Sequence, residues 1–287
     1  MRLLVVRLLL NVTFILSLSD MAVYSYPNFT VGSKKLPSNP IRILHITDPH
    51  LHAHREAMMR GINTFETYKA IIERVASEEH KPDAVIATGD LVQDETRQGY
   101  ERFKNVIQKL NVPVHCIPGN HDSPRIMAEI LNKPPFQFCG STVYENWCII
   151  MLNTAVRWDD GGGLESSQLE ILERTLKAHP EHHTLIGMHH HPIPMGSRWL
   201  DGLGLRNSDD LFTIIDQHTQ VKAITWGHVH QASDRERKGV RMISTPSTGP
   251  QFLPDSDTFI MDTKPPGYRW LNLFPDGSIE TELIWLS

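Results

Sequence analysis

The chain has little cysteine and little excess charge. Only three of its 287 residues are cysteines (Cys116, Cys139 and Cys148), a number too small and too odd for a disulfide framework. The 28 basic and 33 acidic residues give a net charge of −5. This balance argues against a nucleic-acid partner, because proteins dedicated to nucleic acids normally carry a basic face. With 40% hydrophobic and 21% charged residues, the chain is neither collagen-like, nor a coiled coil, nor wholly disordered.

Long apolar runs are missing as well, except at the amino terminus. Residues 1–19 have the charged start and apolar middle of a secretory signal, but this run is too short and too interrupted to predict a membrane span. The alternative is that Met21 is the true start and residues 1–20 are a non-native extension. Residues 27–40 are rich in Pro, Ser and Lys and predict a flexible leader. We expect a cytoplasmic protein with no stable membrane partner, or an exported or anchored one if residues 1–19 are a signal.

Short apolar runs alternate with helical segments after residue 40. Six β-branched-rich runs predict buried strands at 41–47, 84–88, 112–117, 148–153, 184–188 and 221–226. Helices are predicted between them at 64–80, 95–110, 123–131, 166–178 and 208–218. Further strands are expected at 240–245, 258–262, 268–274 and 279–286, the last two as a hairpin around Pro275-Asp276-Gly277. The pattern predicts an α/β fold of two stacked mixed sheets flanked by helices, with residues 1–40 as a leader and 41–287 as one domain.

Sixteen histidines stand out in this composition, and many of them follow predicted strands. Polar residues end five of the six runs: Asp48 and His50, then Asp90, then Asn120 and His121, then His189, then His228 and His230. Ligands bind where strand tips converge in open α/β sheets. Asp, Asn and His are the oxygen and nitrogen donors that suit divalent Mn, Fe or Zn. Each motif alone is also explained by a turn, a cap or a buried histidine, but the five together predict a metal centre.

Seven donors are too many for one ion and suit two. The predicted ligands are Asp48, His50, Asp90, Asn120, His189, His228 and His230. Two ions can clamp the attacking and leaving oxygens at phosphorus, and they lower the pKa of a bound water towards neutrality. Asp90 stands alone on its strand tip and is the candidate bridge. His121 lies next to a ligand and is the candidate donor of a proton to the leaving group.

Other motifs and residues in the sequence bear on different kinds of chemistry. Gly161-Gly162-Gly163 is not a P-loop, because no Gly-Lys-Ser/Thr follows it, and no Gly-x-Ser-x-Gly elbow supports a serine hydrolase. His190 and His191 are second choices to His189 as ligands. Arg206 either contacts phosphate or caps the helix predicted at 208–218. The cysteines are predicted to be small apolar residues in strands.

These motifs resemble the pattern of the calcineurin-like metallophosphoesterase superfamily: D-x-H, G-D, G-N-H-[DE], H and G-H-x-H. The resemblance covers residues 41–286 and extends to the bacterial class III cyclic-nucleotide phosphodiesterases through the segments 42–51, 85–94 and 189–207. It implies one ion on Asp48, His50 and His230, another on Asn120, His189 and His228, and Asp90 shared. Substrate-binding residues implied by it are His50, Asp90, Asn120, His121, His189 and His230.

The resemblance also implies a reaction and its cofactors. Metal-bound hydroxide would hydrolyse 3′,5′-cyclic AMP to 5′-AMP and so lower cellular cyclic AMP, with Fe²⁺ or Mn²⁺ as the expected ions. The alternative is another phosphomonoester or phosphodiester, such as a 2′,3′-cyclic nucleotide or a nucleotide, on the same metal pair. A non-catalytic binding scaffold would predict lost ligands, whereas all seven positions hold competent residues. The sequence leaves the oligomeric state and the choice between cyclic AMP and cyclic GMP open.

Overall fold

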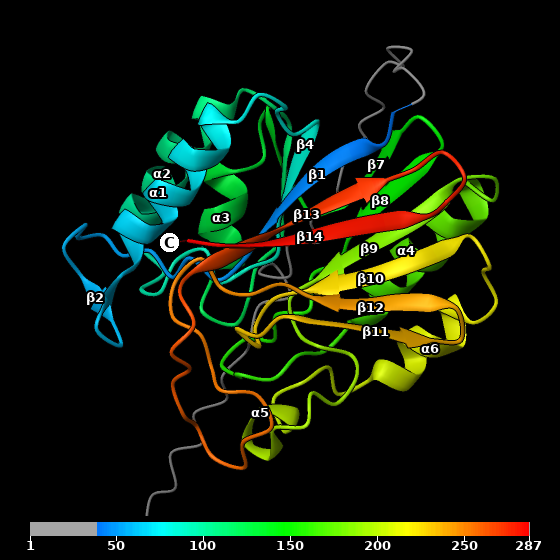
Figure 1. The fold of residues 1–287 in the computed structure, drawn as a ribbon. Coiled ribbons are helices and arrows are strands. Elements are labelled where there is room, and N and C mark those ends of the chain that lie inside the picture. The colour runs from blue at the N-terminus through cyan, green and yellow to red at the C-terminus, as the bar shows by residue number, and fades with distance from the viewer. Residues whose placement is uncertain (1–38, 287) are drawn as a thin grey trace, which may run out of the picture.

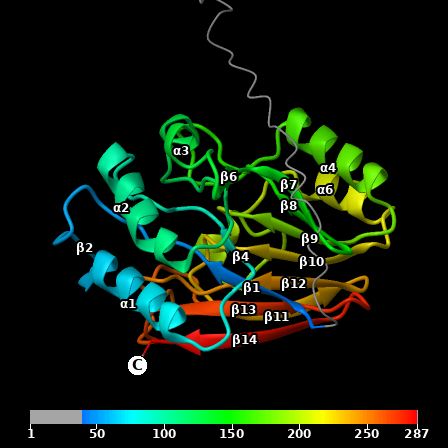
Figure 2. The same ribbon diagram turned by 90° about the horizontal axis from the view of Figure 1, so that it is seen from above.

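Two six-stranded sheets stack face to face in the computed structural model, which describes residues 39–286. Helices cover the outer face of each sheet (Figures 1 and 2). This α/β/β/α arrangement confirms the predicted fold class. The interpretations of residues 1–38 as a signal, an extension or a flexible leader lie outside the described residues.

The first sheet has the strand order β14-β13-β1-β4-β5-β6. Its members are β1 (Ile41–Ile46), β4 (Ala84–Ala87), β5 (Val114–Cys116), β6 (Phe136–Phe138), β13 (Gly267–Leu273) and β14 (Ile279–Trp285). β1, β4, β5 and β6 run parallel, and β13 pairs antiparallel with β1. β13 and β14 form the predicted hairpin, in which Gly277 has the φ of +87° that a glycine adopts without strain.

The second sheet repeats this plan in the order β11-β12-β10-β9-β8-β7. Its members are β7 (Gly140–Tyr144), β8 (Trp147–Met151), β9 (His183–Met188), β10 (Val221–Trp226), β11 (Ser233–Arg237) and β12 (Val240–Ser244). β8, β9, β10 and β12 are parallel, while β7 and β11 are antiparallel edge strands. The parallel strands of both sheets therefore deliver their carboxyl ends, and the residues that follow them, to one edge of the sandwich (Figure 1).

Helices flank both sheets. On the first sheet lie α1 (Thr64–Ser77), α2 (Arg97–Ile107), a 3-10 turn (Gln108–Leu110) and α3 (Pro124–Ile130); on the second lie α4 (Ser166–Ala178) and α6 (Ser208–Ile215). A short hairpin, β2 (Met58–Met59) with β3 (Ile62–Asn63), precedes α1, and α5 (Arg198–Asp201) lies between β9 and α6. The Asn63 side chain accepts a hydrogen bond from the Glu66 N–H, and Thr96 accepts one from Gly99, so each caps the helix that follows it.

Apolar faces of the helices form two cores on the sheets. Between α1 and α2, the rings of Tyr68 and Phe103 stack with centroids 5.4 Å apart, and both are fully buried. On the other side Leu172 and Leu176 of α4 pack in the cluster that holds Trp226 of β10. None of the helices within residues 39–286 has the length and apolar character to span a bilayer.

The structure corrects some predicted elements. The segment 258–262 is not a strand of either sheet. It pairs instead with the neighbouring loop, through an isolated bridge between Phe252 and Met261 and backbone hydrogen bonds from Leu253 to Ile260 and from Asp262 to Gln251. The edge strands β6, β7 and β11 and the short helix α5 were not predicted. Cys116 and Cys148 lie in strands as predicted, whereas Cys139 lies between β6 and β7. All three are buried, and none of them forms a disulfide within residues 39–286.

Candidate metal centre

Turns at the carboxyl ends of β1, β4, β5, β9 and β10 bring all seven predicted donors together. The turn after each strand is tight, and five of the seven residues adopt left-handed backbone: Asp48, His50, Asp90, His228 and His230, with φ between 43° and 65°. Such a conformation is uncommon for a residue with a side chain, although Asp and His tolerate it better than most. Strain of this kind gathers at functional sites, where the surrounding structure enforces it.

The first group of donors comes from both sheets. Nε2 of His50 lies 3.1 Å from Nε2 of His230, and Oδ1 of Asp48 lies 3.4 Å from the same His230 atom. All three side chains are buried, with at most 2% of each residue exposed. Their donor atoms fall within 4.8 Å of one another, which is the spacing a single ion requires.

The second group faces the first across Asp90. Nε2 of His189 lies 3.1 Å from Oδ1 of Asn120, and that oxygen lies 3.0 Å from Nδ1 of His228. Oδ2 of Asp90 lies 3.5 Å from Nε2 of His189 and 3.6 Å from Nε2 of His50. One carboxylate oxygen therefore stands between the two groups, as a bridging ligand must.

Backbone carbonyls orient two of the histidines. Nδ1 of His189 donates to the carbonyl of Thr88 at 2.7 Å, and Nδ1 of His230 donates to that of Pro250 at 2.7 Å. A donated Nδ1–H leaves Nε2 with its lone pair free, and this second contact is the common support of metal-binding histidine. The carbonyl partner thus fixes the tautomer that a metal needs.

Burial and mutual charge shape the protonation of the group. Burial opposes ionisation of Asp90, but His189, His121 and His50 outweigh it and hold the pKa of that carboxyl well below its usual range. Burial lowers the pKa of His50 to about 3. For His189 burial is likewise opposed, chiefly by the Asp90 carboxylate, which raises its pKa to about 9, so a binding ion must displace the proton on Nε2. The donor set is therefore a buried array of carboxylate and imidazole that suits a borderline divalent cation.

His121 stands at the mouth of the group. Its backbone N–H donates to Oδ1 of Asp90 at 2.9 Å, and its Nδ1 lies 3.0 Å from Nε2 of Gln93. The ring meets that of His50 edge to face, with centroids 5.2 Å apart. His121 is partly exposed, and one of its nitrogens also lies within 4.8 Å of donor atoms of His50 and Asp90. It is thus placed to reach a group bound at the centre.

His190 and His191 both lie against the second donor group. Nδ1 of His190 lies 2.8 Å from the hydroxyl of Thr154, and its Nε2 has no hydrogen-bond partner. A nitrogen of His190 does lie within 4.8 Å of nitrogens of His189 and His228. The ring of His191 stacks on that of His228 at 5.8 Å. The contacts of His189 with Asp90 and Asn120 favour it over both neighbours.

Asp122 is a structural support that the sequence motif contained but that was given no role. Its carboxylate accepts hydrogen bonds from the backbone of Leu91 and Gly119 and from the hydroxyl of Tyr100, at 2.9–3.1 Å. Burial, reinforced by the Asp90 carboxylate, raises the pKa of Asp122 to about 7. These bonds fasten the turn that carries Asp90 to the turn that carries Asn120. A Cβ at Gly119 would lie 2.2 Å from Oδ1 of Asp90, so only glycine permits that approach.

Arg206 does not cap α6. Its guanidinium pairs with the carboxylate of Asp159 and is half-exposed, while Asn207 occupies the cap position. A cation at this helix end would in any case oppose the helix dipole. Its contact with phosphate stays a prediction.

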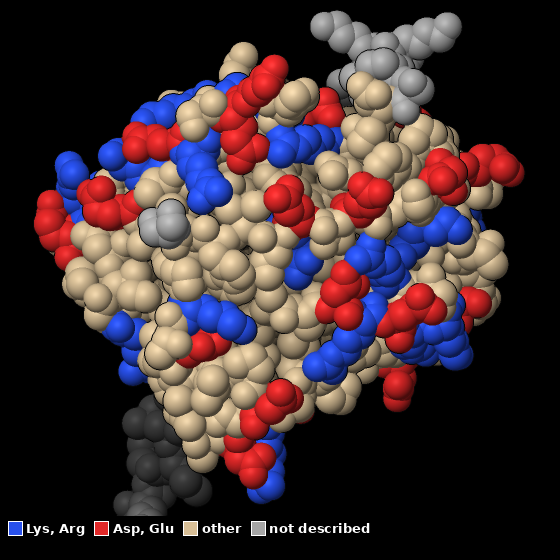
Figure 3. Space-filling model, viewed as in Figure 1, with Lys and Arg blue, Asp and Glu red and all other residues tan. Residues whose placement is uncertain are grey.

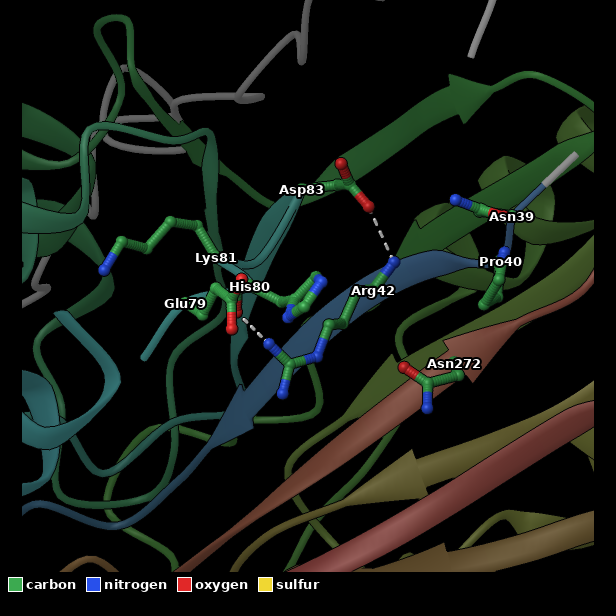
Figure 4. A pocket seen from close by; sticks show the side chains of 8 residues that line it. All are labelled: Asn39, Pro40, Arg42, Glu79, His80, Lys81, Asp83 and Asn272. Carbon is green, nitrogen blue, oxygen red and sulfur yellow. Dashed lines mark hydrogen bonds between the residues drawn. The ribbon is translucent and has the colours of Figure 1, made fainter. Parts of the chain in front are cut away.

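A pocket lies at the opposite edge of the first sheet (Figure 4). It has a volume of about 690 Å³ and is lined by residues near the amino ends of β1 and β4, among them Pro40, Arg42 and Asp83. The Arg42 N–H donates to Oδ2 of Asp83 at 2.7 Å across it. No predicted ligand lines this pocket, so it is separate from the metal centre.

Basic and acidic side chains mingle on the face that includes β13 and β14 (Figure 3). Many are paired, for example Asp216 with Arg237 and Lys238, and Arg241 with Asp234. The absence of a nucleic-acid partner stays a prediction.

Known proteins are similar to this chain in sequence and in fold. A profile of the calcineurin-like phosphoesterase family matches residues 41–232. The chain belongs to the calcineurin-like phosphoesterase family. The family implies a centre of two divalent ions, and the buried Asp and His groups of this chain have the donors for one.

Relatives within the calcineurin-like phosphoesterases extend the likeness. The chain is 41% identical over 244 residues to the 3′,5′-cyclic adenosine monophosphate phosphodiesterase CpdA of Haemophilus influenzae, covering 85% of this chain and 89% of the relative. It is 40% identical over 244 residues to CpdA of Escherichia coli K12, again covering 85% of this chain and 89% of the relative. Among solved structures, a dimetal phosphatase from Danio rerio matches with a TM-score of 0.64 at 13% identity, over 87% of this chain and 100% of that one. The last likeness is one of fold.

Proposed function

We propose that this protein is a metal-dependent phosphodiesterase that hydrolyses 3′,5′-cyclic AMP to 5′-AMP and so lowers cellular cyclic AMP. The observation that carries the proposal is Asp90, whose Oδ2 stands between His50 and His189 at 3.6 and 3.5 Å. Membership of the phosphoesterase family supports the reaction class. The choice of cyclic AMP is supported by identity of about 40% to two proteins named as cyclic AMP phosphodiesterases.

The proposed ligands form two sets joined by Asp90. One ion would lie on Asp48, His50 and His230, the other on Asn120, His189 and His228. The oxygen and nitrogen donors fit Mn²⁺ or Fe²⁺, which we propose as the resident ions; Zn²⁺ and Co²⁺ suit the same donors. Inductively coupled plasma analysis of protein purified without added metal would identify the ions.

When bound, a pair of divalent ions lowers the pKa of water to make a nucleophile and offsets negative charge on the phosphate oxygens. The chain supplies the remaining functions. His121 would contact the phosphate and give a proton to the 3′ oxygen as its bond to phosphorus breaks, while the oxygen of water forms the new bond. Water and cyclic AMP thus yield 5′-AMP. Substrate would contact His50, Asp90, Asn120, His121, His189 and His230.

The alternative function uses the same metal centre to hydrolyse a different phosphate ester. A 2′,3′-cyclic nucleotide, a nucleotide or another phosphomonoester presents the same phosphate oxygens to the ions. The deciding experiment follows 3′,5′-cyclic AMP, 3′,5′-cyclic GMP, 2′,3′-cyclic AMP and p-nitrophenyl phosphate with Mn²⁺- or Fe²⁺-loaded protein. Chelator-sensitive formation of 5′-AMP supports the proposal. Turnover of the other esters alone overturns the cyclic AMP assignment and leaves the metal chemistry standing.

We also propose that residues 41–287 form one catalytic domain in the cytoplasm. The pairing of β13 with β1 supports the first part, because a strand beyond the family match completes the sheet that carries Asp48. The second part is supported by the three cysteines, none of which forms a disulfide within residues 39–286, since a reducing compartment keeps thiols reduced. Export of a fusion to alkaline phosphatase would contradict the location.

A further inference from the structure

A line of buried hydrogen bonds runs from His45 to Asp48. Nε2 of His45, on β1, lies 2.8 Å from the hydroxyl of Thr88, which lies 2.8 Å from the hydroxyl of Thr47. The Thr47 hydroxyl in turn donates to Oδ2 of Asp48 at 2.6 Å. All four residues are fully buried, so no water competes for these bonds.

The other nitrogen of His45 reaches the second sheet. Nδ1 lies 2.7 Å from the hydroxyl of Thr245, which follows β12, and 3.0 Å from that of Thr225 on β10. His45 therefore links both sheets directly beneath the turns that carry Asp48 and His230. Burial of a polar group costs free energy unless its hydrogen bonds are made. The imidazole of His45 is buried among three hydroxyl groups and makes no contact with the candidate metal centre, so its presence there calls for an explanation.

The direction of every proton along the line follows from Asp48. An ionised carboxylate only accepts, so the one hydrogen of Thr47 is committed to Oδ2. The Thr47 oxygen then accepts from Thr88, and the Thr88 oxygen accepts from Nε2–H of His45. Nδ1 of His45 is left to accept from a threonine hydroxyl, for which Thr245 is the nearer. Only the neutral Nε2–H tautomer of His45 satisfies all these bonds.

The hydrogen-bonded line gives the two carboxylate oxygens of Asp48 different partners. Oδ2 is held by Thr47, whereas Oδ1 points to His230 at 3.4 Å and to His50 at 3.9 Å. The backbone N–H of His228 donates to both oxygens, at 3.0 and 3.2 Å. Gly227 leaves room for this contact, because a Cβ there would lie 2.0 Å from the Thr47 hydroxyl.

We infer that His45, Thr88 and Thr47 form a positioning relay that holds Asp48 as a one-oxygen ligand and so sets the affinity of the ion shared with His50 and His230. This inference rests on the ligand assignment of the proposed function. Burial, aided by the charge of Arg269, lowers the pKa of His45 to about 3, which agrees with the neutral tautomer. The relay acts through Asp48 and touches no substrate.

Metal titration of the whole chain tests the relay without any measurement of catalysis. Metal-free wild-type protein, Thr47→Val and His45→Leu are titrated with Mn²⁺ by calorimetry, and the two binding steps are resolved. Loss of an outer-shell partner typically weakens metal binding by about 10–100-fold, and we expect this loss in one step only. His45→Gln restores the affinity, because its amide can donate to Thr88 and accept from Thr245.

His115→Leu is the matched control. His115 is also buried in the first sheet, but its Nε2 lies 2.7 Å from the hydroxyl of Tyr144 and makes no link to a ligand. We expect both of its binding steps to match those of the wild type. A second control combines Thr47→Val with Asp48→Ala. Because Asp48→Ala removes the carboxylate that the relay holds, the second change should add nothing.

The outcomes are distinct. The relay is overturned if His45→Leu and Thr47→Val bind both ions as tightly as the wild type, or if His115→Leu weakens binding equally. It is also overturned if Thr47→Val weakens binding further in the Asp48→Ala background. A wild-type chain that binds fewer than two ions overturns the proposed metal centre and the relay together, whereas failure on cyclic AMP alone leaves the relay intact.

Discussion

Oδ1 of Asp48 lies 3.4 Å from Nε2 of His230, although the two residues follow strands of different sheets. The proposed metal centre thus depends on the relative position of the two sheets. Each of these turns has a left-handed backbone, with φ of 52° at Asp48 and 47° at His230. Ions that bind between residues of the two sheets would therefore stabilise the folded chain, because they bind the native state and not the unfolded one.

Asp90→Asn tests the bridge. The amide keeps the shape of the side chain but loses its charge, so we expect at least one ion to be lost and activity to fall by more than about a hundredfold, the upper range for loss of a supporting group. Metal analysis and turnover of cyclic AMP measure the two effects. Asp216→Asn, at an exposed ion pair with Arg237, is the control and should keep both. Full metal content in Asp90→Asn would remove the bridging role.

His121→Ala tests the proposed acid. Because His121 is outside both proposed ligand sets, we expect the variant to retain its ions and to lose about 10²–10⁴-fold in kcat on cyclic AMP, the usual worth of a general acid. The loss should shrink with bis(p-nitrophenyl) phosphate, whose leaving group needs no proton. Stopped assays with both esters measure this difference. An equal loss on both esters would point to phosphate binding instead of proton transfer.

Asp122→Asn tests the support between the turns. The amide nitrogen would face backbone donors that now meet a carboxylate, and each unsatisfied donor costs about 1–3 kcal/mol. We expect a lower free energy of unfolding in urea and weaker metal binding. Tyr144→Phe removes a hydrogen bond to His115 away from the centre and should cost stability alone. Wild-type metal affinity in Asp122→Asn would show that the support is unnecessary.

Patterning predicted much of this molecule because its parallel strands are buried. The run 41–47 is rich in Ile and Leu, and the strand β1 ends at Ile46, so the polar residues that follow marked both the strand end and the proposed ligand Asp48. The same reasoning located Asp90 and His228. Strand tips in parallel sheets share an edge, so their gathering followed from topology.

Other features of the fold and of the site leave no recognisable pattern in the sequence. β6 has three residues, too few for a period of two to register. Phe259 and Ile260 look like strand residues, yet they lie outside the sheets and are 38% and 46% exposed. Thr47 links Asp48 to Thr88, a partner distant in sequence, and Asp122 holds backbone N–H groups of Leu91 and Gly119. Composition and spacing reveal neither role.

His115 gives a prediction for stability against pH. Burial lowers its pKa from 6.5 to about 4, so between these values the unfolded chain takes up a proton that the folded chain does not. Folding stability attributable to His115 is therefore present above pH 6.5 and declines as the pH falls, by about 2 kcal/mol between pH 7 and pH 5. His115→Leu lacks this group. We expect its destabilisation relative to the wild type, measured by urea unfolding in chelator, to shrink by that amount at pH 5. A difference that stays constant from pH 7 to pH 5 would mean that His115 titrates alike in the folded and unfolded chains.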